Sequence, residues 1–182
     1  IRRFDRYIDE HGIAHRLAAE DACQLSNRYP SDKYLLTAEQ CSEALLTQVF
    51  SPRIAAPEVF RQFVYAWLTG NGDLHAKNLS IVENRKGQYE LSPIYDIPST
   101  APYGDKSMAL LLSGKKDGLS RRRFLTFAHN IGVSSRVAEH VLEEVLTGTE
   151  HLAEQAREEL PFDSHRMKEL LKVLKNRRRS LL

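Results

Sequence analysis

The sequence predicts a mainly α-helical fold that carries one small β-hairpin. Over most of the chain, apolar residues recur at the three- and four-residue spacing of helices. Near the middle, a turn sequence at 84–87 separates two short segments, 79–82 and 89–91, that are typical of strands. With 182 residues, 42% of them apolar, the chain is long enough to form one packed domain.

Two helices are expected before residue 52. The first covers residues 15–25. The second begins at Thr37, because Thr37 and Gln40 have the spacing of a capping box, and Pro52 ends it. Its inward-facing residues are expected to be Cys41, Ala44, Leu45, Val49 and Phe50.

The third and most apolar helix is predicted to begin with Pro57 in its first turn, where the missing N–H costs little. It ends at the glycines of 70–72. Its buried face is predicted to comprise Phe60, Phe63, Val64, Trp67 and Leu68. Residues 99–118 are rich in loop formers, and the chain from 120 onward is expected to be helical. The apolar faces there are Phe124, Leu125 and Ala128; Val137, Val141, Leu142 and Val145; and Met167, Leu170, Leu171 and Leu174.

Composition excludes several classes of protein. The formal charge of +2, from 26 basic and 24 acidic residues, argues against a dedicated nucleic-acid binder, and the basic runs 121–123 and 177–179 are expected to be solvated helix ends. Cys23 and Cys41 have no zinc-binding spacing and are expected to be reduced, buried thiols of a cytoplasmic protein. No apolar run approaches the roughly 20 residues that span a bilayer, so no membrane partner is expected. Because the sequence begins at isoleucine, we expect a piece of a longer or processed chain.

The loop after the third predicted helix carries the candidate chemistry. Phosphoryl transfer needs a carboxylate near the attacking hydroxyl and oxygen ligands that hold magnesium on the phosphates. Asp73 and Asn78 have the kinase spacing D-x-x-x-x-N, and Asp96 follows the predicted hairpin, 18 residues beyond Asn78. We expect Asn78 and Asp96 to lie at adjacent ends of the hairpin and to ligate one ion. His75 and Lys77 lie between them as further catalytic candidates, with a role in supporting the loop as the alternative for each.

Each of these signals is weak alone, since a loop Asp or Asn often only caps a turn. In combination, 70–80 and 91–100 resemble the catalytic and metal loops of the HipA family, the kinase toxins of bacterial toxin–antitoxin modules. The segments 3–6 and 16–24 resemble the part of that family that follows the lobe hinge. Ala19 and Arg2-Arg3 depart from the glutamine and glutamate that the family often has at these places.

The resemblance implies the C-terminal lobe of a protein-kinase-like fold with serine/threonine kinase activity that uses ATP and Mg²⁺. It implies Asp73 as the catalytic base, Asn78 and Asp96 as magnesium ligands, and Phe4 in the hinge against adenine. The whole of 1–182 is then the lobe, with a hinge or linker at 1–15, catalytic and metal-binding loops at 57–98 and a helical subdomain at 120–182. A glycine-rich loop and a strand lysine are missing from these residues, so an N-terminal lobe is an expected partner.

The other partners that the resemblance implies are a HipB-like antitoxin, DNA only indirectly through that antitoxin, and a protein substrate such as an aminoacyl-tRNA synthetase. Two alternatives stay open. One is a small-molecule phosphotransferase of the aminoglycoside type, which also uses a G-D-L-H loop. The other is a non-catalytic module that only docks the antitoxin.

Overall fold

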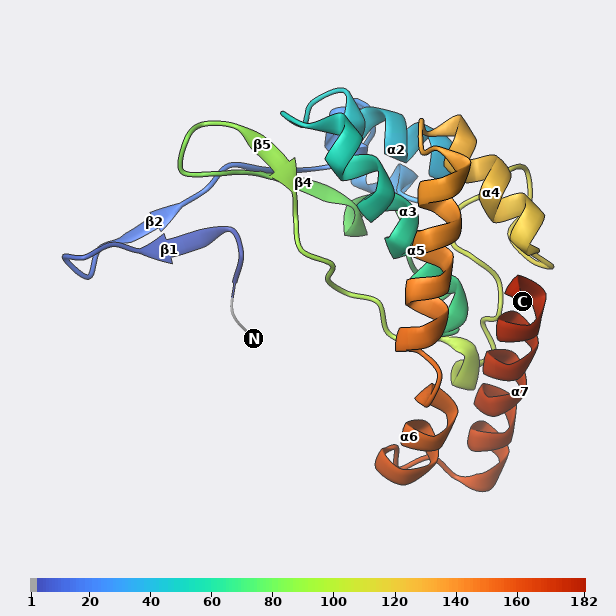
Figure 1. Ribbon diagram of the computed structural model, residues 1–182. Helices are drawn as coiled ribbons and strands as arrows, with labels where there is room; N and C mark the ends of the chain where they lie inside the picture. The colour runs from blue at the N-terminus through green and yellow to red at the C-terminus, as the bar shows by residue number, and fades with distance from the viewer. Residues whose placement is uncertain (1–2) are drawn as a thin grey trace.

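The computed structural model describes residues 3–182 and has a mainly helical body with two small antiparallel sheets. Strands β1 (Arg6–Ile8) and β2 (Ala14–Arg16) form a hairpin that projects from the body (Figure 1). Both strands overlap the predicted linker at 1–15, whose first two residues lie outside the described part. None of the helices in the described part is long and apolar enough to cross a membrane.

The predicted hairpin has a third strand. Strands β3 (Ala19–Asp21), β4 (Ser80–Glu83) and β5 (Tyr89–Leu91) form an antiparallel sheet in the order β3-β4-β5. The predicted helix at 15–25 is therefore wrong except for its last turn, α1 (Ala22–Leu25). The reason is tertiary: β3 pairs with β4 over its whole length, and Asp21 then caps α1 in a capping box with Gln24.

Helix α2 (Ala38–Leu46) begins at the predicted capping box of Thr37 and Gln40. The inward placement of Phe50 is wrong, because the helix ends at Leu46 and the Phe50 side chain is 66% exposed. Instead, the Phe50 backbone N–H donates to the carbonyl of Tyr89 and ties this segment to β5.

Helix α3 (Pro52–Leu68) begins earlier than predicted. Pro52, expected to end the preceding helix, is itself the first residue of α3, where proline is well tolerated. Pro57 therefore lies inside the helix and not in its first turn, at the expense of one backbone hydrogen bond. The helix ends as predicted, with Gly70 in the left-handed region at φ 76°.

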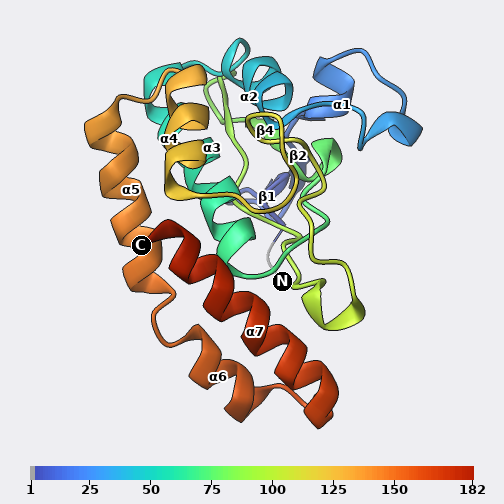
Figure 2. The same ribbon diagram turned by 90° about the vertical axis from the view of Figure 1, so that its right-hand side faces the viewer.

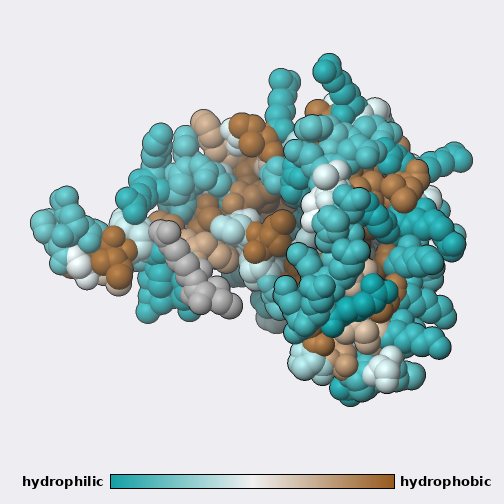
Figure 3. Space-filling view, turned by 60° about the horizontal axis from the view of Figure 1, so that its bottom comes forward, coloured by the Kyte–Doolittle hydropathy of each residue, from teal (hydrophilic) through white to brown (hydrophobic). Residues whose placement is uncertain are grey.

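Four helices complete the chain: α4 (Arg121–Asn130), α5 (Ser135–Gly148), α6 (Leu152–Glu159) and α7 (Ser164–Leu181). The predicted face of α5 is buried except for Val137, which is 39% exposed. Helix α3 is central to the main core, where Phe63 meets the ring of Phe127 edge-on at 5.1 Å. Helices α6 and α7 run side by side beyond it (Figures 1 and 2). Their outer surface is largely hydrophilic, with apolar side chains exposed in patches (Figure 3).

Arg177 of α7 anchors the last helix to the end of α3. It is 4% exposed, so the prediction that 177–179 is a solvated run is wrong at this residue. Its guanidinium lies 4.1 Å from the Trp67 ring centroid and donates to the carbonyls of Trp67, at 2.8 Å, and of Lys106. Ser180 accepts a hydrogen bond from the Trp67 indole at 3.2 Å. The C-terminal helix thus fixes the residues directly before the 70–78 loop.

Candidate functional site

The candidate site lies where the loop after α3 meets the segment after β5. Asn71, which is fully buried, joins the two: its side chain donates to the carbonyl of Pro98 at 2.7 Å and accepts from the backbone N–H of Asp73 at 2.9 Å. Gly72 has no room for a side chain, because a Cβ there would lie 2.7 Å from Thr100, Asp105 and Ser107. The loop that carries Asp73 is therefore held between α3 and 98–107.

The structure brings Asp73, Asn78 and Asp96 together. Asn78, the last residue of the 3-10 helix Ala76–Asn78, is 5% exposed. Its Nδ2 donates to the Asp73 carbonyl at 3.2 Å, to the Asp96 carbonyl at 3.3 Å and to the Asp96 carboxylate at 3.1 Å. Asp96 has a left-handed backbone, at φ 53°, which is uncommon for a residue with a side chain. The Asp73 carboxylate is 40% exposed, so it is accessible to a substrate.

Asn78 and Asp96 carry oxygen atoms of the kind that bind a magnesium ion on a nucleotide. In the described part of the chain, the three hydrogen bonds of the Asn78 side chain come from Nδ2, so its Oδ1 remains available to a cation. Within residues 3–182 no three His, Cys, Asp or Glu side chains cluster as a metal cage. Magnesium commonly keeps several waters and takes one or two protein ligands together with substrate phosphates. The residues present therefore fit Mg²⁺ that arrives with a nucleotide.

His75 is buried beside the base candidate. Its Nε2 accepts a hydrogen bond from the Lys33 ammonium at 2.9 Å and lies 4.0 Å from Asp73 Oδ1. Burial, with the Lys33 charge second, lowers the pKa of His75 below its ordinary value. Because Nε2 accepts, the proton of the neutral ring is assigned to Nδ1, which has no hydrogen-bond partner in the described structure. This geometry suits a residue that supports the loop better than a proton carrier.

Lys77 forms an ion pair with Asp21 at the end of β3, with 2.6 Å between Nζ and Oδ2. The hydrogen bond to Asp21 raises the pKa of Lys77. The Lys77 carbonyl accepts from the hydroxyl of Tyr95 at 2.8 Å, which ties the loop to the residue before Asp96. Lys77 is thus held against the sheet, while its backbone carbonyl fixes the segment that leads to Asp96.

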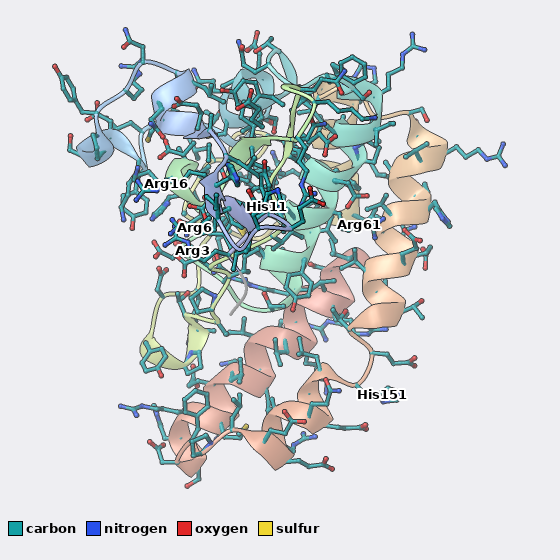
Figure 4. The ribbon with its side chains drawn as sticks, turned by 90° about the vertical axis from the view of Figure 1, so that its left-hand side faces the viewer. Arg3, Arg6, His11, Arg16, Arg61 and His151 are labelled. Carbon is teal, nitrogen blue, oxygen red and sulfur yellow. The ribbon has the colours of Figure 1, made fainter. Side chains whose placement is uncertain are left out.

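Phe4 lies in a separate part of the site, a cleft of about 840 Å³ between the β1–β2 hairpin, β3 and the segment 93–95. Its ring lies 5.4 Å from that of Tyr95. Arg3 and Arg6 lie together on this side of the molecule (Figure 4). Lys77 also lines the cleft, whereas Asp73, Asn78 and Asp96 lie next to it and not in its wall. The cleft therefore combines the aromatic rings of Phe4 and Tyr95 with charged side chains that include Lys77.

Five contacts of the site escape the sequence patterns. They are made by Asp21, Lys33, Tyr34, Asn71 and Tyr95. Asn71 and Tyr95 lie close to Asp73 and Asp96 in the sequence and carry polar groups, and these two facts could have suggested that they contact the site. Lys33 and Tyr34 lie in another loop, and no spacing rule links them to Asp73.

Comparisons with known proteins agree with one another. The model of the family described as "HipA-like C-terminal domain" matches residues 1–153. The chain is 32% identical over 141 residues to the Sinorhizobium fredii protein named "Putative kinase Y4mE". This match covers 73% of the chain and 33% of that protein. A Haemophilus influenzae protein named "Putative kinase" is 26% identical over 159 residues, covering 75% of the chain and 46% of the relative. The chain thus spans less than half the length of these curated relatives.

Among solved structures, a chain of the Shewanella oneidensis toxin–antitoxin complex of HipA, HipB and operator DNA has a similar fold, with a TM-score of 0.74. The match covers 96% of this chain and 47% of that one, at 20% sequence identity. At this identity the likeness concerns the fold.

Proposed function

Because the chain belongs to the family of HipA-like C-terminal domains, we propose that it is the ATP- and magnesium-binding lobe of a serine/threonine protein kinase in a bacterial toxin–antitoxin system. In this proposal the fold is the C-terminal lobe of a protein-kinase-like enzyme, with the loops of 57–98 at its centre. A second lobe supplies the glycine-rich loop and the strand lysine, neither of which these residues contain. Names of relatives support a kinase in general terms, and the residue roles are our inference.

One observation carries the proposal: the Asn78 amide bonds both to the Asp73 backbone and to the Asp96 carboxylate. A base and two oxygen ligands are thereby fixed relative to one another. Catalysis of phosphoryl transfer consists mainly of positioning and charge neutralisation, so a fixed spacing of these groups is what the reaction needs.

In the proposed reaction, the γ-phosphoryl group would pass from ATP to the substrate hydroxyl and ADP would leave, and a magnesium ion held by Asn78 and Asp96 would supply charge neutralisation. Asp73 accepts the proton of the substrate hydroxyl, and Asn78 and Asp96 hold the metal through their oxygens. His75 supports the loop, and Lys77 braces it against Asp21. Phe4, across from Tyr95, offers an apolar wall for adenine.

The partners follow from the family and its fold neighbour. A HipB-like antitoxin is proposed, because a chain of similar fold was solved in a complex with HipB and operator DNA. Contact with DNA would then run through the antitoxin. The substrate is proposed to be a protein with an accessible serine or threonine, and an aminoacyl-tRNA synthetase is the candidate that the family suggests.

The test is transfer of labelled phosphate from ATP to protein by the complete enzyme, in which this chain is accompanied by its N-terminal lobe. Asp73→Ala should reduce labelling about 100-fold or more, the lower end of what a catalytic base contributes. Glu159→Ala, an exposed acid on α6, is the matched control and should label normally. Unchanged labelling by Asp73→Ala would remove Asp73 from its role.

The same assay separates the alternatives. A docking module would bind the antitoxin and label nothing in any variant. A small-molecule phosphotransferase would transfer phosphate to an aminoglycoside in preference to protein.

A further inference from the structure

The segment that follows the 3-10 helix Pro30–Asp32 lies against the candidate catalytic loop. Three contacts join them: the Lys33 carbonyl accepts from the backbone N–H of Ala76 at 3.1 Å, the Lys33 ammonium donates to His75, and the Tyr34 hydroxyl donates to Asp73. We propose that Lys33 and Tyr34 are positioning residues that hold the Asp73 carboxylate and the His75 ring in their working orientation. This inference rests on the proposed kinase function of Asp73.

Tyr34 contacts the proposed base directly. Its hydroxyl lies 2.6 Å from Asp73 Oδ1, although 39 residues separate the two positions. The hydrogen bond to Asp73 raises the pKa of the Tyr34 phenol, so the hydroxyl keeps its proton and remains the donor. With Oδ1 held, Oδ2 is left to accept the hydrogen bond of a substrate hydroxyl. A carboxylate fixed through one oxygen presents the other in one direction, and correct orientation is a large part of the catalysis of this reaction.

Lys33 contacts the catalytic loop through His75. Its ammonium lies 2.9 Å from His75 Nε2 and 4.9 Å from the centre of the Tyr34 ring. The Tyr34 ring in turn meets the His75 ring edge-on, with 5.2 Å between centroids. Lys33, His75 and Tyr34 therefore form one packed unit, and Tyr34 is the member that reaches Asp73.

A purely structural role of Tyr34 and a positioning role predict different results when its hydroxyl is removed. Tyr34 is 43% exposed, and its hydrogen bond to the half-exposed Asp73 adds little to the free energy of unfolding in such a place. Removing the hydroxyl should therefore leave stability nearly unchanged. If the hydroxyl positions the base, its loss should lower the rate of transfer at saturating substrate.

The first experiment is Tyr34→Phe in the complete enzyme, which keeps the ring on His75 and removes only the hydroxyl. We expect kcat to fall about tenfold, the size of one hydrogen bond to a charged group, with the KM for ATP unchanged. Tyr29→Phe is the matched control, since Tyr29 lies in the same loop, is 78% exposed and is expected to keep wild-type kcat. Wild-type kcat in Tyr34→Phe would overturn the proposal.

The second experiment asks whether Tyr34 acts through Asp73. In single-turnover labelling with enzyme in excess, Tyr34→Phe should cause no further loss when added to Asp73→Asn. A second, full loss in the double variant would mean that Tyr34 works elsewhere and would also overturn the proposal. For Lys33, Lys33→Met should lower kcat and Lys33→Arg should restore most of it.

Failure of this inference is distinct from failure of the proposed function. Absence of phosphate transfer by the wild-type complete enzyme would contradict the kinase assignment, and full activity in Asp73→Ala would remove Asp73 from its role as the base. Loss of activity in Asp73→Ala together with full activity in Tyr34→Phe would contradict only the positioning role of Tyr34.

Discussion

Asn78 donates a hydrogen bond from its amide to the carboxylate of Asp96 over 3.1 Å, although 18 residues of chain separate them. The hairpin of β4 and β5 accounts for this proximity, because Asn78 precedes its first strand and Asp96 follows its second. The neutral amide of Asn78 and the charged carboxylate of Asp96 are thus placed side by side. This difference in charge gives the first prediction.

Asp96→Ala should weaken binding of Mg-ATP more than Asn78→Ala does, because a carboxylate supplies the negative charge that magnesium prefers. We expect a loss of about tenfold or more for Asp96→Ala, measured by calorimetry on the complete enzyme with and without magnesium. Melting temperatures are needed alongside, since Asn78 is buried and its loss also disturbs the fold. Wild-type affinity in Asp96→Ala would remove Asp96 from the metal site.

Arg177→Met should destabilise the protein by roughly 2–4 kcal/mol, because it leaves the buried carbonyl of Trp67 and the carbonyl of Lys106 without their donor. Burial lowers the pKa of Arg177 to about 10, so the guanidinium is still charged at neutral pH. Arg177→Lys should not restore stability, since an ammonium lacks the planar fork that reaches both carbonyls. Urea unfolding measures the effect, and Arg179→Met, at an exposed position of the same helix, should unfold like wild type.

His75 should make stability depend on pH. Its folded pKa lies below the ordinary value of about 6.5, so the unfolded chain binds more protons in the interval between the two values. Stability is therefore fully present above about pH 6.5 and falls as the pH drops through the folded pKa. His75→Gln should reduce this slope in melts between pH 7.5 and 5, whereas His129→Gln, at an exposed position, should preserve it. A slope that survives in His75→Gln would assign it to other groups.

Residues 1–182 alone should bind ATP weakly and show almost no turnover. The proposed base and metal ligands lie on one side of the nucleotide only, and transfer depends on positioning from both sides. Side-by-side turnover of this chain and of the protein reconstituted with its N-terminal lobe, at saturating magnesium, is the measurement. Equal rates would mean that this chain clamps the nucleotide without a second lobe.

The sequence predicted the parts of the site that obey local rules. The spacing of Asp73 and Asn78, the turn at 84–87 and the position of Asp96 together predicted that the three residues would converge, and they do. Helix α3 was predicted from the period of its apolar residues. Its first residue was not, because Pro52 and Pro57 fit a first turn equally well and only packing decides that the helix begins at Pro52.

The remaining contacts depend on the tertiary fold. Residues 19–21 look helical alone and become a strand because β4 offers a free edge. Arg177 lies in a run of arginines that is typical of a solvated helix end, and only the neighbouring Trp67 explains its burial. Tyr34 meets Asp73 through loop packing, which no periodicity encodes.

The anchoring of Trp67 by Arg177 and Ser180 has a consequence for the order in which the molecule matures during synthesis. A ribosome makes Asp73 about a hundred residues before it makes Arg177. The loop of the nascent chain therefore lacks the contacts between α7 and Trp67 during that time. The end of α3 reaches its final packing only after α7 has left the exit tunnel and docked. If the chain acts as a toxin, this late step delays the activity of each new molecule until α7 has docked.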